Sequence, residues 1–141
     1  MIFFILEKIS TVSTVIENLR YTAAHQWAAV ESNNIAAVGI TDFAQEALGD
    51  VVFVEFPKIG QVVTKDQACA VVESVKSASD VYAPVSGTIV EINTAIRESL
   101  QSVNSEPYKA WLFKIKLTEP EQLETLLSAL SYQALTDQES N

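Results

Sequence analysis

The chain has 141 residues and a formal net charge of −9, with 9 Lys and Arg against 18 Asp and Glu. This length suits one domain with appendages and is short for a catalytic cleft plus a second domain. The acidic balance excludes binding to a nucleic-acid backbone, which requires clustered Lys and Arg. Cys69 is the only cysteine, so an intrachain disulfide is impossible and a reducing compartment fits.

Residues 1–20 form an N-terminal extension. Glu7 and Lys8 interrupt the apolar run 1–6 before the apolar segment of a secretory signal is complete. The extension also contains acidic residues, whereas a mitochondrial transit peptide is rich in Arg and poor in acidic residues. No apolar run in the chain approaches the roughly 20 residues that cross a bilayer. We therefore expect neither a signal peptide nor a membrane partner.

Two short apolar runs, 27–31 and 35–40, follow the extension and are separated by the turn-forming cluster Ser32-Asn33-Asn34. This arrangement predicts a β-hairpin. The next segment predicts a short helix over Asp42–Leu48, with Asp42 as its N-cap and Gln45 three residues later as in a capping box. Gly49 is suited to the positive-φ position that ends such a helix.

A strand–turn–strand pattern occurs twice, over residues 54–66 and 81–93. The identical positions share one constant spacing and are Val54/Val81, Pro57/Pro84, Gly60/Gly87 and Val63/Val90. Two such units related by a pseudo-two-fold axis can close one small sheet sandwich. The connection between them, with a strand over 68–75, then becomes a hairpin that holds Lys76 at its tip.

The remaining segments predict three elements. Asn93 or Thr94 can cap one or two helical turns that reach Leu100. Residues 111–117 alternate between apolar and polar, which predicts a half-buried strand. The tail carries Leu123, Leu126, Leu127 and Leu130 at helical spacing, so we expect an amphipathic helix over Pro120–Leu130 that packs on the sheet. The polar end from Thr136 is expected to fray.

Lys76 is the candidate functional residue. A single lysine is ordinarily a solvated surface residue, but this one lies at the junction of the two repeats. Its neighbours Ser74, Ser77 and Ala78 are small, so they leave room for an enzyme to reach the amine. A lysine presented in this way suits covalent modification.

The sequence around this lysine resembles the lipoyl-lysine motif of the glycine cleavage system H-protein family. The resemblance is carried by Glu73-Ser74-Val75-Lys76-Ser77 and by ordered blocks that extend from Tyr21 to Leu117. They include residues 25–27, 39–45, 48–55, 79–87 and 103–108. Two positions depart from the family pattern: Gln26 stands where Glu is usual, and Lys109-Ala110 stands where a glycine is common. Neither departure touches Lys76.

The resemblance implies a mainly β fold, a barrel-sandwich hybrid of the lipoyl/biotinyl type with short flanking helices and a C-terminal amphipathic helix. It divides the chain into the extension 1–20, an H-protein domain 21–118 and a tail 119–141 packed on that domain. It implies a monomer of the bacterial cytoplasm, with the mitochondrial matrix as the alternative.

The same resemblance implies that Lys76 bears lipoate in amide linkage. Glu73 and Gly87 would then help the lipoylating enzyme to recognise the hairpin, whose tip is formed by Ser74, Val75 and Ser77. The implied role is a lipoyl carrier that takes the aminomethyl group of glycine from a glycine decarboxylase to an aminomethyltransferase. A dihydrolipoyl dehydrogenase would reoxidise it. The chemistry would belong to the cofactor and the partners.

Other residues offer no competing chemistry. Cys69 lies in an apolar strand and is expected to be a small core residue. His25 is the only histidine and has no partner at metal-ligand spacing, so we expect a structural role near Trp27. One His and one Cys cannot build a nucleophile, a base and an orienting group. We therefore expect a non-catalytic carrier subunit.

Two alternative functions stay open, and a third is disfavoured. A lipoate relay would donate the lipoyl group to other acceptors and is compatible with the main prediction. A biotinyl carrier shares the fold, but its hairpin usually reads Met-Lys-Met, whereas Val75 and Ser77 flank Lys76 here. A lipoyl domain of a 2-oxoacid dehydrogenase is disfavoured because no Pro/Ala-rich linker follows.

Overall fold

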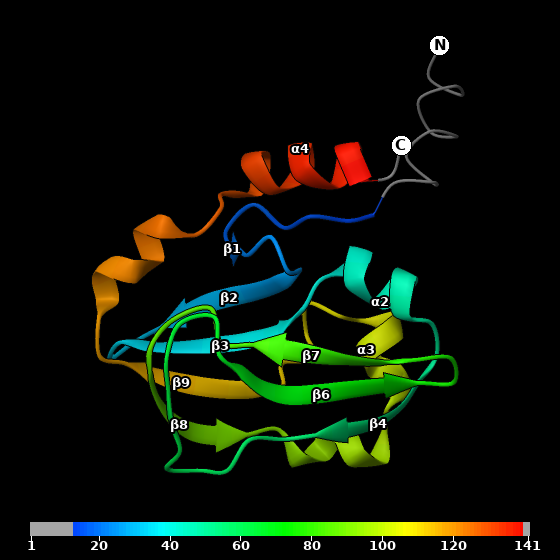
Figure 1. Ribbon diagram of the computed structural model, residues 1–141, viewed down its shortest axis with the longest axis horizontal. Helices are drawn as coiled ribbons and strands as arrows, with labels where there is room; N and C mark the ends of the chain where they lie inside the picture. The colour runs from blue at the N-terminus through cyan, green and yellow to red at the C-terminus, as the bar shows by residue number, and fades with distance from the viewer. Residues whose placement is uncertain (1–12, 140–141) are drawn as a thin grey trace.

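The computed structural model describes residues 13–139 and arranges them mainly as β-structure in two sheets (Figure 1). One sheet has six strands in the order β1-β2-β3-β9-β8-β5, and the other has three in the order β4-β6-β7. The strands are β1 (Arg20–Tyr21), β2 (Gln26–Glu31), β3 (Ile35–Ile40), β4 (Val51–Glu55), β5 (Val62–Val63), β6 (Ala68–Ser74), β7 (Ala78–Tyr82), β8 (Gly87–Ile92) and β9 (Phe113–Leu117). Most of the expected N-terminal extension lies outside the described residues.

The helices are short and sit around these sheets. They are α2 (Asp42–Leu48), η1 (Thr94–Glu98), α3 (Gln101–Ser105), η2 (Pro120–Thr125) and α4 (Ala129–Glu139). Figure 1 shows α2 and α3 at the end of the molecule where the chain turns between β6 and β7, and α4 beside β1. Within residues 13–139, no helix is long and apolar enough to cross a membrane.

One contiguous core lies between the sheets. It draws on both of them, with Val54, Val72 and Val81 from the three-stranded sheet, and Ile89 and Ile115 from the other, all at most 3% exposed. The alternation predicted over 111–117 is confirmed for β9, where Phe113, Ile115 and Leu117 are buried, but the strand begins at Phe113, and Leu112 before it is also buried. The mainly β fold class is therefore confirmed.

The two sequence repeats occupy equivalent places in the two sheets. The first copy supplies β4 to the three-stranded sheet and β5 to the six-stranded one. The second copy supplies β7 and β8 in the same way, and β5 pairs with β8. β6 runs between β4 and β7 and pairs with both. The strand that connects the repeats is therefore the centre of the smaller sheet, and its end forms the predicted hairpin.

The predicted hairpin of residues 27–40 is also confirmed as β2 and β3, joined through Asn33 and Asn34 at positive φ. The cap of the next helix was predicted wrongly. Thr41 is the N-cap of α2, and its Oγ1 accepts a hydrogen bond from the Ala44 N–H at 3.2 Å. Asp42 instead lies in the first turn and accepts a hydrogen bond from the Gln45 amide at 2.7 Å.

The single C-terminal helix predicted over 120–130 is wrong. The chain forms the 3-10 helix η2, becomes extended at Leu126, and begins α4 only at Ala129. The interruption arises because Leu127 pairs with Tyr21: the two residues exchange backbone hydrogen bonds of 2.9 and 2.8 Å. The leucines at helical spacing therefore do not form one helix, because Leu127 forms a β-bridge instead. The end of the chain from Thr136 was expected to fray, but Thr136 is buried within α4.

Candidate functional site

Lys76 lies at the exposed tip of the β6–β7 hairpin, as the repeat predicted. Ser74 holds the tip in shape from beneath. Its Oγ accepts hydrogen bonds from the N–H groups of Lys76 at 3.2 Å and Ser77 at 3.1 Å. Its own N–H donates to the Ser77 carbonyl at 2.7 Å. Because Ser74 is only 9% exposed, these bonds are largely shielded from water, and the tip has a defined conformation.

The tip is also attached to the neighbouring strand. The N–H of Val75 donates a hydrogen bond to the carbonyl of Asp50 at 3.2 Å, just before β4 begins. Loop tips are ordinarily the most mobile parts of a domain. Here the residue before Lys76 is bonded to a second segment of backbone, so the lysine is presented from a supported position.

The Lys76 side chain passes over Gly49 at the C-terminal end of α2. A Cβ placed on Gly49 would lie 3.3 Å from the Lys76 Cε. Gly49 has φ +88°, a conformation that L residues with side chains rarely adopt. Asn104 fixes this backbone, because its amide donates to the Gly49 carbonyl at 2.9 Å and its Oδ1 accepts from the Val51 N–H at 2.9 Å.

The structure brings Glu73 close to Lys76 but places Gly87 elsewhere. Glu73 lies on β6 and pairs with Phe53 on one side and Ala78 on the other. Gly87 is buried in β8 of the six-stranded sheet, where a Cβ would meet the Lys116 carbonyl oxygen at 2.1 Å. A recognition role for either residue stays a prediction. For Gly87 the placement indicates an effect through the fold, since no side chain fits there.

A cavity of about 300 Å³ opens beside the hairpin, between β7, α2 and the segment 24–26. Phe43 and Leu48 give it an apolar wall, and Ser77–Val81 line the hairpin side. Ser77 directly follows Lys76, so the cavity begins next to the modified position that the sequence predicts. Its lining combines apolar side chains with the small polar residues of the hairpin.

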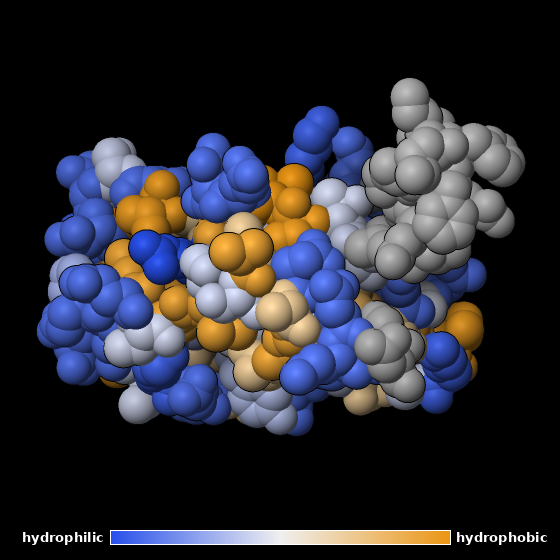
Figure 2. Space-filling view, turned by 90° about the horizontal axis from the view of Figure 1, so that it is seen from above, coloured by the Kyte–Doolittle hydropathy of each residue, from blue (hydrophilic) through white to orange (hydrophobic). Residues whose placement is uncertain are grey.

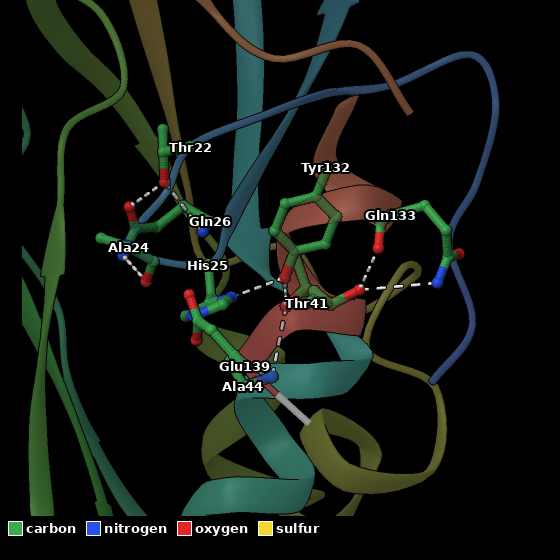
Figure 3. A network of polar contacts seen from close by, with 10 residues as sticks. Thr22, Ala24, His25, Gln26, Thr41, Ala44, Tyr132, Gln133 and Glu139 are labelled. Carbon is green, nitrogen blue, oxygen red and sulfur yellow. Dashed lines mark hydrogen bonds and ion pairs between the residues drawn. The ribbon is translucent and has the colours of Figure 1, made fainter. Parts of the chain in front are cut away.

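His25 lines the same cavity and connects it to the C-terminal helix (Figure 3). Its Nδ1 is hydrogen-bonded to the Tyr132 hydroxyl at 2.7 Å, and its Nε2 pairs with Glu139 at 3.0 Å. The Tyr132 hydroxyl also bonds Thr41 Oγ1 at 2.6 Å. The His25 ring stacks on Phe43 with centroids 4.6 Å apart. His25 is thus structural as expected, but its partners are Phe43 and α4.

Sequence reasoning missed this network because its members are distant along the chain. His25 and Tyr132 are separated by more than one hundred residues, and neither periodicity nor local spacing relates them. Figure 2, which looks down on the α4 side, shows hydrophilic residues surrounding apolar ones across this face. The only feature of the sequence that pointed to this network is the polar character of α4, and that character does not say which residue α4 contacts.

Cys69 is partly buried on β6 and packs against the core. Burial raises the pKa of its thiol from 9.0 to about 12. The thiol is therefore protonated at neutral pH, which is unsuited to nucleophilic or redox chemistry. Among the described residues, no cluster of three or more His, Cys, Asp or Glu side chains is placed to hold a metal ion.

The chain is similar to known proteins over most of its length. The family model described as glycine cleavage H-protein matches residues 19–139. The chain belongs to the glycine cleavage H-protein family. It is 46% identical over 127 residues to glycine cleavage system H protein 2 of Pseudomonas aeruginosa, with 90% of this chain and 98% of that protein covered.

Two further members of the family are similar over most of their length. The chain is 51% identical over 128 residues to the glycine cleavage system H protein of Escherichia coli O7:K1, covering 90% of this chain and 99% of the relative. A crystal structure of a glycine cleavage system H protein from Mycobacterium marinum superposes with a TM-score of 0.78 at 38% identity, covering 87% of this chain and 99% of that one. The predicted family membership is confirmed over most of the chain.

Proposed function

We propose that this chain is the lipoyl carrier of a glycine cleavage system and that Lys76 is the lipoylated residue. The observation that carries the proposal is the presentation of Lys76. It is exposed at the hairpin tip, and two independent sets of hydrogen bonds, through Ser74 and Asp50, support the backbone around it. Membership of the H-protein family supplies the biological setting.

The residues of the tip fit a covalently attached lipoyl group. Ser77 and Ala78 are small and exposed, so they leave the amine accessible to an acylating enzyme. A bound lipoyl group would supply the thiol–disulfide chemistry that accepts and releases an aminomethyl group. The chain itself holds the attachment point at a defined place. Tethering converts each transfer into a local event at a high effective concentration.

The cavity beside the hairpin supports a resting place for the loaded arm. Its apolar wall, with Phe43 and Leu48, matches a hydrocarbon chain, and Ser77 and Ser79 on the hairpin side add polar residues beside it. Enclosure would keep water away from the carried group between partners. Under this proposal the chain stores the intermediate as well as moving it.

The partners in this proposal are the three other components of glycine cleavage and a lipoylating enzyme. A glycine decarboxylase loads the arm, an aminomethyltransferase unloads it, and a dihydrolipoyl dehydrogenase reoxidises it. The chain contributes no catalytic group of its own. No feature of the described residues favours a biotinyl carrier, and Val75 and Ser77 flank Lys76 in place of the two methionines that such a carrier would have.

The experiment that tests the proposal is reconstitution of glycine-dependent bicarbonate exchange with a purified glycine decarboxylase. The lipoylated chain is expected to support exchange, whereas Lys76→Arg is expected to stay folded and support none. Lys58→Arg, at another exposed lysine, serves as the matched control and should retain full exchange. A lipoylated wild-type chain that supports no exchange would leave the lipoate relay as the function.

A further inference from the structure

Strand β4 turns two consecutive apolar side chains toward solvent. Val51 pairs with Ser74 and Phe53 pairs with Glu73, so the register shifts by a bulge at Val52. A regular strand points successive side chains to opposite faces. The bulge breaks this alternation, and Val52 and Phe53 are 48% and 51% exposed. Such bulges are specific features that redirect side chains.

Val75 extends this apolar surface to the hairpin tip. Its hydrogen bond to the Asp50 carbonyl places it across from the residue that precedes β4. Since Ser74 points into the core beside Val51, the next residue faces outward, and Val75 is 74% exposed. Val52, Phe53 and Val75 thus form one outward patch, the β4–tip patch, and Lys76 follows it directly in the chain.

Acidic residues border the β4–tip patch. Asp50 precedes it and Glu55 follows it on β4, and both are exposed. Glu73 lies opposite Phe53 on β6 and is partly exposed. An edge strand that is merely protected against self-association ordinarily carries charges at its outward positions. Here the adjacent exposed positions Val52 and Phe53 are apolar, and the charged residues Asp50, Glu55 and Glu73 flank them, which is the arrangement of a docking surface.

We propose that the β4–tip patch is the docking site of the enzyme that acylates Lys76, a protein whose contact surface has an apolar centre and a basic rim. The inference rests on the proposed function and names the partner for the patch. Acylation requires the partner to reach Nζ itself. The Lys76 amine, after losing its proton, attacks the carbonyl carbon of an activated lipoyl ester or anhydride. The N–C bond forms as the bond to the leaving group breaks, the leaving group departs with the electron pair, and the nitrogen gives up a second proton to the leaving group or to water.

This requirement separates the acylating enzyme from the other partners. Glycine decarboxylase, aminomethyltransferase and the dehydrogenase would act at the far end of a long arm, which can reach them from a distance. Only the acylating enzyme must bring its own active site up to the hairpin tip. Its footprint therefore includes the surface beside Lys76. Phe53 is the anchor in this surface, because aromatic side chains are enriched among residues that dominate binding energy.

The experiment measures lipoylation kinetics with a purified ATP-dependent lipoate ligase and free lipoate. The Phe53→Ser and Val52→Ser variants are expected to raise KM for the chain about tenfold with little change in kcat. Val62→Ser is the matched control, because Val62 is 72% exposed on β5 of the other sheet, and it should leave KM unchanged. Thermal unfolding of each variant verifies that the fold is kept.

A second variant tests the acidic rim without touching the apolar side chains. Asp50→Lys combined with Glu55→Lys is expected to raise KM at low salt, and the dependence of KM on salt should flatten. A wild-type KM in both the apolar and the charge variants, with the chain still lipoylated, would overturn the docking inference alone. An increase in KM for the aminomethyltransferase, with ligase kinetics unchanged, would also overturn it. A wild-type chain that no ligase lipoylates would overturn the proposed function as well.

Discussion

The Lys76 side chain lies against Gly49, so the residue that ends α2 also contacts the proposed site of modification. The Lys76 Cε is 3.3 Å from the position of a Cβ on residue 49, and Nζ is 3.9 Å from it. Asn104 ties the same glycine to Gln45 and to the start of β4 through hydrogen bonds. The path of the lysine therefore depends on a helix end that is distant from it in sequence.

Gly49→Ala is expected to disturb both stability and lipoylation. The backbone of the alanine must adopt φ +88°, which costs about 1–3 kcal/mol of folding free energy. The added methyl group also presses against the aliphatic part of the Lys76 side chain. Gly60→Ala is the matched control, since Gly60 has φ +92° and nothing within 4 Å of its Cβ position. Both variants should melt at lower temperature, but only Gly49→Ala should slow lipoylation. Equal lipoylation rates in the two variants would show that Gly49 has no influence on the lysine.

Gly87→Ala is expected to be severely destabilising. Its Cβ would lie 2.1 Å from the Lys116 carbonyl oxygen, a backbone atom that cannot move without separating β8 from β9. The resulting strain, added to lost pairing, places the cost above about 3 kcal/mol. Urea unfolding followed by tryptophan fluorescence measures it. A variant with the wild-type midpoint would contradict the packing role and would leave direct recognition by the lipoylating enzyme as the explanation of Gly87.

Tyr132→Phe is expected to loosen α4 and the cavity wall. The variant removes the hydroxyl that joins His25 Nδ1 and Thr41 Oγ1, at a cost of about 1–3 kcal/mol because both partners lose a shielded hydrogen bond. Leu130→Ala on the same helix is the control, since Leu130 is 83% exposed. Hydrogen exchange of the α4 amides should accelerate in the tyrosine variant only. Unchanged exchange would mean that packing alone holds the helix.

The Cys69 thiol is expected to react slowly with iodoacetamide in the folded chain. Its pKa is raised from 9.0 to about 12 by burial, so the thiolate fraction near pH 8 falls about 1,000-fold relative to an exposed thiol. Because the shift is upward, the reaction rate should keep rising with pH well above pH 9. Mass spectrometry of alkylated chain at several pH values measures this rate. Rapid labelling of folded chain at pH 8 would contradict the buried assignment.

The sequence was sufficient to predict elements whose signals are local or repeated. The repeat located the hairpin and Lys76, and the alternation of 111–117 located β9, because each pattern reflects one buried face. It was insufficient where distant segments decide the outcome. Leu127 leaves a helical pattern to pair with Tyr21, and His25 finds its partners on α4. The bulge that exposes Val52 and Phe53 depends on the register with β6, which no single-strand pattern specifies.

The mass of chain produced together with a lipoylating enzyme shows directly whether Lys76 carries lipoate. We expect the intact chain to gain the mass of one lipoyl group, peptide fragmentation to place the addition on Lys76, and Lys76→Arg to gain nothing. An unmodified wild-type chain, a biotinyl mass, or an addition that persists in Lys76→Arg would contradict this expectation.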